Sequence, residues 1–443
     1  MRLSHTLART SVAFDDPNLV SAAGLVPVLA LADRAGLREL ADKHLSVPTD
    51  KGANAGLKVA SLVAGMVAGA DSIDDMAVLR HGGMSKVFAS AYAPSTLGSF
   101  LRAFTFGHVR QLDAIAARFL LALAARTRLL GPIAEQGAAS STDTPSSTTG
   151  GYALVDVDDT IIEVHGHQKQ GAGFGYSKVR GLNAFLATLS TAGHAPVIVA
   201  QRLRKGSCGS PRGAARLIGD AVKQARRLLG PDRPVLVRMD SAFFGGPAVR
   251  AALAGGADVS VTVRLTSTIK TAIAGIDERA WTTIEYTDAI RDETTGTWIS
   301  RAEVAEIPFT AFAAQKKAHQ VPGRLVVRRI PDANAEKNKA AGQGTLFDVW
   351  RFHAFFTTTD PDVLDTVAAD QLHRHHAIIE QVHADLKGSA LAHLPSVILS
   401  RPRGQPADLH LCVVDGVLDV ALDEACSAGS DDFGDSLLGR VAV

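Results

Sequence analysis

The sequence predicts an α/β fold in which an all-helical region precedes a mixed sheet with flanking helices. Two observations lead to this prediction. Over residues 20–128, apolar residues recur at helical spacing, as in DRAGLRELADKHL and HVRQLDAIAARFLLALAARTRLL. After residue 151, β-rich runs separated by turn residues replace that periodicity. Strands that then alternate with helices indicate a mixed sheet covered by helices.

Residues 1–134 are therefore expected to form a helical N-terminal region. The segment EQGAASSTDTPSSTTGG, residues 135–151, follows this region and is rich in Ser, Thr and Gly without apolar periodicity. Such a composition is typical of a linker between folded parts. We expect the chemistry of the protein to lie on one side of this linker.

Three strands, a helix, a strand, a helix and a strand are predicted after the linker. The strands are expected at residues 152–166, 183–190, 196–203, 234–240 and 258–265. Residues 266–350 break this rhythm and read as a mostly β insertion. A returning strand, HAFFTTT, and a long helix that starts near Pro361 follow within residues 351–400. Residues 401–443 form a C-terminal region with an acidic tail.

Composition is ordinary for a soluble protein, with a formal net charge of +1 over 443 residues. Apolar runs are too short to span a bilayer, and the N-terminus has no continuous apolar segment typical of a signal peptide. Three scattered cysteines favour a reducing cytoplasm. Basic residues gather between residues 197 and 230, whereas acids gather between 413 and 443. The basic segment is either a phosphate-binding surface or plain solvated surface.

Two of the predicted strands carry acidic residues that are candidates for chemistry. Because side chains alternate along a strand, Asp156, Asp158 and Thr160 share one face and Asp159 lies on the other. Asp240 ends the run PVLVRMD, where the chain leaves the sheet. Acids at strand ends open onto the crevice where α/β sheets bind ligands, although Asp240 could also cap the following turn.

The segment HRHHAIIEQVHADLK, residues 373–387, predicts a helix with one narrow polar face. At about 100° per residue, that face bears five side chains: His373, His376, Glu380, His383 and Lys387. One interpretation is a zinc site made of His376, Glu380 and His383. Another adds Glu380 to Asp158 and Asp240 as oxygen ligands for Mg²⁺. A third is a solvated face with pairs at helical spacing.

This ordered set of motifs resembles the DDE transposases of bacterial insertion sequences. In one subgroup the last acid lies in a signature of Tyr, two residues, Arg, three residues, Glu, six residues and Lys. Glu380 and Lys387 match this spacing, while His373 and His376 occupy the Tyr and Arg positions. Asp158-Asp159-Thr160 is similar to the first-acid motif, and VRMDSAFFG provides Asp240 as the second acid. The resemblance covers most of the chain.

The resemblance implies a ribonuclease H-like catalytic core, in two parts at residues 152–265 and 351–400, preceded by a DNA-binding helical region. It implies Asp158, Asp240 and Glu380 as catalytic metal ligands for two Mg²⁺ ions, for which Mn²⁺ can substitute. Thr160 would support the first acid, and the helix would bring Lys387 and His376 to phosphates, with His373 beside them. The implied activity is binding of terminal inverted repeats, nicking, and attack of a 3′-hydroxyl on target DNA by a dimer.

Four basic residues of the central segment are then expected along the DNA backbone: Arg202, Arg204, Lys205 and Arg212. The protein would act in the cytoplasm, at the nucleoid, without a membrane partner. Two other functions stay open from the residues alone, a zinc-dependent hydrolase and a DNA-binding protein without chemistry. Asp156 shares the face of Asp158 and is the alternative candidate for the first acid.

Overall fold

The computed structural model describes residues 16–131, 151–165, 169, 171–291, 298–331 and 350–388, without the side chains of 286–291 and 298–300. The predicted acidic tail and all of the predicted linker except Gly151 lie outside these residues. The chain divides into two compact units. Unit 1 comprises residues 1–128, 162–171 and 385–443, and unit 2 comprises residues 129–161 and 172–384.

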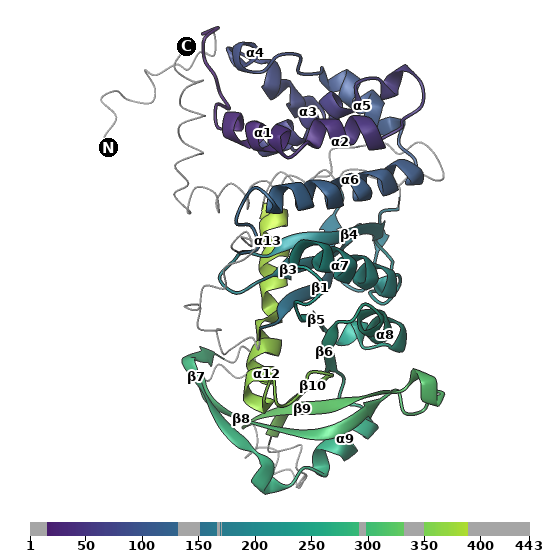
Figure 1. Cartoon of the computed structure of the whole chain (residues 1–443), viewed down its shortest axis with the longest axis vertical. Coiled ribbons are helices and arrows are strands. Elements are labelled where there is room, and N and C mark those ends of the chain that lie inside the picture. Colours follow the sequence, from purple (N-terminus) through teal and green to yellow (C-terminus); the bar gives the residue numbers. More distant parts are fainter. Residues whose placement is uncertain are drawn as a thin grey trace, which may run out of the picture. The chain divides into compact units, whose positions relative to one another are not determined.

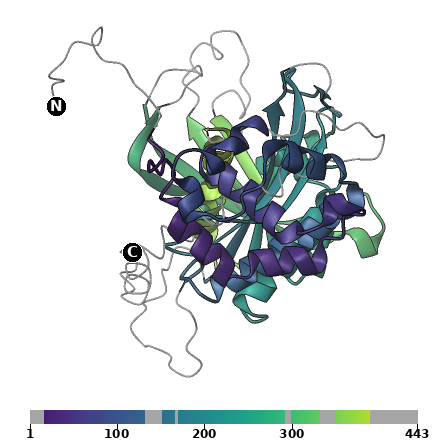
Figure 2. The same ribbon diagram turned by 90° about the horizontal axis from the view of Figure 1, so that it is seen from above.

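Residues 16–128 of unit 1 form helices joined by turns, in agreement with the apolar periodicity of the sequence (Figures 1 and 2). The longest helix, α6, begins with a capping box in which Thr105 and His108 bond each other's backbone. Its buried side chains repeat at helical spacing, from Val109 to Leu123. The helices are α1 (Leu25–Arg34), α2 (Leu37–His44), α3 (Ala55–Val67), α4 (Met84–Val87), α5 (Pro94–Arg102) and α6 (Phe106–Ala124), with 3-10 turns η2 (Asp50–Gly52) and η3 (Asp74–Arg80).

Unit 2 is built on one mixed sheet whose first part has the strand order β4-β3-β1-β5-β6. Strands β3 and β4 are antiparallel, whereas β1, β5 and β6 run parallel. This arrangement is that of a ribonuclease H-like core, as predicted. The strands are β1 (Ala153–Glu163), β2 (Gly173–Phe174), β3 (Arg180–Ser190), β4 (Val197–Lys205), β5 (Val235–Met239) and β6 (Asp258–Val263). Helices α7 (Ala214–Leu229) and α8 (Gly246–Ala254) pack on this sheet and on each other.

The β-rich insertion continues the same sheet. Strand β10 pairs antiparallel with β6 on one side and with β9 on the other, and β8 and β7 follow (Figure 1). Two hairpin strands of 14 and 11 residues therefore extend the catalytic sheet outward. The elements are α9 (Ser267–Ala274), η5 (Glu278–Ala280), β7 (Thr282–Arg291), β8 (Trp298–Ala311), η6 (Lys317–His319), β9 (Val321–Pro331) and β10 (Trp350–Thr357).

The last helix within the described residues is not continuous. It consists of α12 (Thr366–Arg374), one 3-10 turn η7 (His375–Ala377) and α13 (Ile378–Gly388). The Asp365 carboxylate caps α12 by accepting a 2.8 Å hydrogen bond from the Ala368 backbone N–H. Leu372 of α12 packs in a buried cluster with Tyr152, Leu236 and Phe355. Each such buried side chain contributes about 1.5–3 kcal/mol, so this contact anchors α12 on the sheet.

Candidate active site

The strand register places a buried ion pair at the centre of the site. Asp156 of β1 lies opposite Arg238 of β5, and both side chains are almost wholly buried. The guanidinium donates hydrogen bonds of 2.7 Å from Nε and from Nη2 to the two carboxylate oxygens. Burial alone would raise the pKa of Asp156, but Arg238 and His376 outweigh it and hold that pKa below its ordinary value. Asp156 is therefore already neutralised by a protein cation.

Asp158 and Asp240 lie two residues further along the same two strands. The register that pairs Asp156 with Arg238, extended by two residues, sets Asp158 across from Asp240. Burial and the charge of Asp158 raise the pKa of Asp240 above its ordinary value. Asp240 also caps the turn η4 (Ser241–Phe243) by accepting a 2.9 Å hydrogen bond from the Ala242 backbone N–H. Asp158, inside β1, and Asp240, directly after β5, thus follow the last paired residues of these two parallel strands, Val157 and Met239.

The neighbouring acid Asp159 takes no part in this pair. Its carboxylate accepts hydrogen bonds of 2.6 Å each from Arg204 Nη2 and from Asn183 Nδ2. Both the Asp159 and Arg204 side chains are 10% exposed, and Arg204 also stacks over the ring of Phe185 at 4.1 Å. Alternation along β1 therefore separates a structural acid from the candidate catalytic one.

His376 lies beside the Asp156–Arg238 pair. Its Nδ1 donates a 2.8 Å hydrogen bond to Asp156 Oδ1, because an ionised carboxylate can only accept. This bond ties η7 to β1 across 220 residues of sequence. His376 also lowers the pKa of Asp240, against the larger effects of burial and Asp158, which places its imidazole near the second carboxylate. His376 thus borders the candidate site.

His373 is half-buried against β6, although the helical periodicity grouped it with the polar face. Ser260 and Thr262 of β6 hydrogen-bond its Nδ1 and Nε2 at 2.7 and 3.0 Å, and its ring stacks on Phe355 at 4.1 Å. Burial and nearby cations, His376 foremost, hold the pKa of His373 well below its ordinary value. Both ring nitrogens are therefore occupied by the sheet, and the imidazole is neutral.

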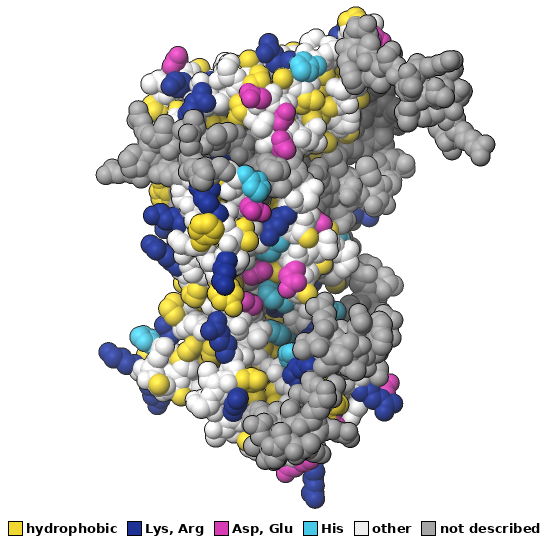
Figure 3. Space-filling model, turned by 180° about the vertical axis from the view of Figure 1, so that it is seen from behind, with side chains coloured by type: hydrophobic (Ala, Val, Ile, Leu, Met, Phe, Trp, Pro, Cys, Tyr) yellow, Lys and Arg dark blue, Asp and Glu magenta, His cyan; other side chains and the backbone are white. Residues whose placement is uncertain are grey.

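The other predicted residues of the helix differ in exposure. Glu380 and Lys387 are exposed, whereas His383 is 5% exposed and its Nε2 lies 3.5 Å from Asp158 Oδ2. Thr160 is half-buried on β1, two residues beyond Asp158. Figure 3 shows histidine and acidic side chains gathered in one region of this face of the molecule.

The carboxylate pair fits a hard divalent cation. Asp158 and Asp240 supply the oxygen ligands that Mg²⁺ prefers, and burial together with the charge of Asp158 raises the pKa of Asp240. In the described part of the chain, however, no group of three or more His, Cys, Asp or Glu side chains is close enough to hold a metal ion. Glu380 is thus not gathered with the two aspartates, and His376, Glu380 and His383 do not form the zinc site considered from the sequence.

Comparison with protein families decides the affiliation of the chain. Residues 6–335 of the 443 match the model of the transposase DDE domain group 1. The chain belongs to this family of DDE transposases. The match includes Asp158 and Asp240 of the transposase and ends before Glu380 and the helix that bears it. No curated protein sequence matches the chain.

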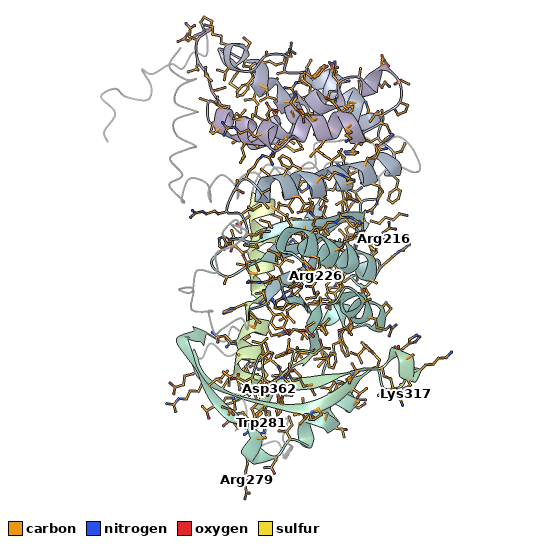
Figure 4. The ribbon with its side chains drawn as sticks, in the orientation of Figure 1. Arg216, Arg226, Arg279, Trp281, Lys317 and Asp362 are labelled. Carbon is orange, nitrogen blue, oxygen red and sulfur yellow. The ribbon has the colours of Figure 1, made fainter. Side chains whose placement is uncertain are left out.

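The four basic residues expected on DNA fall into two classes in this transposase. Lys205 and Arg212 are exposed at the end of β4 and before α7. Arg202 instead pairs with Asp220, and Arg204 donates to the Ser210 and Arg212 carbonyl oxygens as well as to Asp159. Further basic residues lie on α7, among them Arg216 and Arg226 (Figure 4). Arg226 bonds three backbone carbonyl oxygens, so it too stabilises a loop.

The sequence did not identify Arg238 as part of the site. One signal was present, because Arg238 precedes Asp240 by two residues as Asp156 precedes Asp158. A cation within an otherwise apolar strand requires a buried partner of opposite charge. Asp156, an acid within a strand, likewise requires a buried cation. The pairing depends on β1 and β5 being adjacent and in register, which neither segment specifies alone.

Among the described residues, no helix is long and apolar enough to cross a membrane.

Proposed function

We propose that this transposase binds the terminal inverted repeats of an insertion sequence, nicks the DNA and joins the 3′-hydroxyl ends to target DNA. Asp158, Asp240 and Glu380 are its catalytic acids and bind divalent metal, with two Mg²⁺ ions as the native set and Mn²⁺ able to replace them. The observation that supports this most is the pair of carboxylates just beyond the last paired residues of β1 and β5, where Asp158 raises the pKa of Asp240.

The residues around the pair have complementary tasks. Asp158 and Asp240 would hold the divalent cations, which would supply Lewis-acid stabilisation of charge on the oxygens of the phosphodiester. Asp240 is fixed by its bond to the η4 backbone, so its carboxylate is oriented before any ligand arrives. Glu380 is exposed and joins the pair when DNA and metal are bound. Thr160 supports the first acid from the same face of β1.

His376 and Lys387 are proposed to contact DNA phosphates. The Nδ1 of His376 is held by Asp156, so Nε2 is the ring nitrogen left for a phosphate, which it contacts when protonated. Lys387 lies on the exposed side of α13. For His373, the engaged ring nitrogens support a different task, namely holding α12 on β6. The Tyr position of the subgroup signature is thus used here for anchoring.

DNA binding is assigned to the helical N-terminal region and to the exposed cations Lys205 and Arg212. We assign Arg202 and Arg204, which the sequence grouped with them, to the protein's own ion pairs. The active form is a homodimer that brings two element ends together. The partner is double-stranded DNA, and the site of action is the nucleoid.

Excision in cells tests this function. The gene is placed between its own genomic flanks beside a marker, and wild type is compared with Asp158→Asn, Asp240→Asn and Glu380→Gln. We expect excision by wild type and a loss of at least about 100-fold in each variant, because each removes a metal ligand while preserving shape. Asp362→Asn is the matched control, since Asp362 is exposed on a loop of unit 2 (Figure 4).

The alternatives give different results in the same assay. A DNA-binding relative without chemistry would bind element ends but would not excise the marker in wild type. If wild type is inactive, the double substitution His373→Tyr/His376→Arg tests whether the signature residues restore activity. Excision that persists in Glu380→Gln would remove Glu380 from the site and leave Asp158 and Asp240 with another third ligand.

A further inference from the structure

A buried histidine beside the first acid makes no hydrogen bond in the described structure. His383 is 5% exposed, and neither ring nitrogen has a hydrogen-bond partner among the described residues. Buried polar groups are nearly always paired, because leaving one unpaired costs its full desolvation. A leucine at this position would fill the same interior without that cost. The imidazole therefore needs an explanation beyond packing.

The nearest acidic group is the candidate first ligand. His383 Nε2 lies 3.5 Å from Asp158 Oδ2, which is longer than an N–H···O hydrogen bond of about 2.7–3.2 Å. A movement of a few tenths of an ångström would close this distance. Asp158 itself is 23% exposed at its side chain, so one part of its carboxylate faces the buried histidine while another part reaches solvent.

A second contact between a histidine and an aspartate is already formed two residues away on β1, at Asp156. His376 donates to Asp156 at 2.8 Å, and Asp156 and Asp158 occupy alternate positions on one face of β1. His376 of η7 and His383 of α13 both face β1, as their contacts with Asp156 and Asp158 show. The helix and the strand thus present two histidine–aspartate pairs side by side, one closed and one open.

We propose that His383 is a positioning residue for Asp158. Its Nε2–H donates a hydrogen bond to Asp158 Oδ2 when the site takes up a divalent cation, and it leaves the other carboxylate oxygen to bind that cation. This inference rests on the proposed function, because it takes Asp158 as a metal ligand. Glu380 lies between His376 and His383 in the sequence, so closing the second pair also fixes the helix segment that bears the third acid.

Binding of Mn²⁺ alone to the full-length, DNA-free chain tests this role, measured by electron paramagnetic resonance. The series is wild type, Asp158→Asn, His383→Leu, His383→Met and His383→Gln. We expect both apolar variants to weaken Mn²⁺ binding by about 10–100-fold, as loss of a group that orients a ligand does elsewhere. His383→Gln keeps an N–H donor and should recover part of the affinity. The melting temperatures of the metal-free variants report folding separately.

The outcomes separate the two hypotheses. If Asp158→Asn weakens Mn²⁺ binding but folded His383→Leu or His383→Met binds as wild type does, the positioning role is wrong and the proposed function stands. If Asp158→Asn binds as wild type does, the proposed metal site fails and the positioning role fails with it. As a second measurement, the ¹⁵N resonances of the His383 ring should shift on addition of Mg²⁺ in wild type and not in Asp158→Asn. Unchanged resonances in wild type would overturn the inference.

Discussion

At the scale of single residues, four acids of similar sequence context have different tasks because their partners differ. Asp156 is neutralised by Arg238 and Asp159 by Arg204, whereas Asp158 has a histidine 3.5 Å away and raises the pKa of Asp240. The side chains of a strand alternate, so moving by one residue along β1 exchanges a candidate ligand for a structural ion pair. Moving two residues back, from Asp158 to Asp156, also reaches a structural ion pair, because the register sets Arg238 opposite Asp156.

The opposition between Asp158 and Asp240 predicts a stability gain when one charge is removed. A raised pKa means that the ionised Asp240 carboxylate is less favourable in the folded chain than in the unfolded chain. Asp240→Asn should therefore raise the metal-free melting temperature at neutral pH by about 2 °C, because Asn also caps η4. Differential scanning calorimetry measures this change.

The pH dependence of that gain follows from the same shift. Protonation relieves the repulsion, so the stability of wild type is favoured below the pKa of Asp240 and declines as the pH rises through it. The difference between Asp240→Asn and wild type should thus shrink as the solution becomes acidic. A difference that grows towards acidic pH would show that the two carboxylates do not destabilise each other.

Breaking the Asp156–Arg238 pair should have the opposite effect. Arg238→Met leaves the Asp156 carboxylate buried without its main countercharge, which costs about 3–5 kcal/mol. The double variant Asp156→Asn/Arg238→Met should recover part of this loss, since a neutral amide is less costly to bury. Urea denaturation of the two variants and wild type gives the free energies of unfolding. Equal losses in both variants would mean that the charge of Asp156 is not the cause.

At the scale of elements, the strands and helices of the core could be predicted, but their mutual placement could not. Alternation along β1 and the apolar runs of β5 and β6 depend on local sequence alone. The helix after β10 was expected to be continuous, and η7 interrupts it. A 3-10 turn advances about 120° per residue instead of 100°, so the periodicity before and after it no longer defines one face. This break explains why the His373 ring packs against β6 and is half-buried although Glu380 is exposed.

Arg204 illustrates the same limit for the basic segment. Its sequence neighbours indicated a phosphate-binding surface, but the loop between β4 and α7 folds back over it and supplies the Ser210 and Arg212 carbonyl oxygens. Whether a cation faces solvent or its own backbone depends on where that loop passes. The Arg204 side chain, which bonds this loop, is 10% exposed, whereas Lys205 at the last position of β4 is exposed.

The anchoring of α12 by His373 gives a prediction for this element. His373→Ala removes a ring stacked on Phe355 and leaves the hydroxyls of Ser260 and Thr262 without their shared partner. We expect a loss of about 2–4 kcal/mol in the free energy of unfolding from the cavity and the unmade hydrogen bonds. His373→Phe should restore the stacking but not the hydrogen bonds. Chemical denaturation measures both.

A direct contact between His373 and DNA would give another pattern. The affinity for duplex DNA should be the same in His373→Phe and wild type at a temperature where both are folded, because the neutral ring offers no charge to a phosphate. Reduced affinity with unchanged stability would assign His373 to the DNA surface instead of the sheet.

At the scale of the whole molecule, a net charge of only +1 means that DNA binding has to come from local arrangement of cations. Part of the positive charge is used internally, as the ion pairs of Arg202, Arg204 and Arg238 show. The family affiliation and the fold class were accessible from the order of motifs, whereas the division of cations between structure and surface required the three-dimensional arrangement.

That division predicts how the salt dependence of DNA binding changes on substitution. Each phosphate contact adds about 0.9 to the slope of log affinity against log salt concentration for B-form DNA. Lys205→Ala and Arg212→Ala should each lower the slope measured with a non-specific duplex by about one, because both side chains are exposed. Arg202→Ala is the matched comparison in the same strand, and its charge is already offset by Asp220. We expect its slope to equal that of wild type in fluorescence anisotropy titrations. If Arg202→Ala lowers the slope while Lys205→Ala and Arg212→Ala do not, the DNA backbone passes the other side of β4 and the assignment of these cations is reversed.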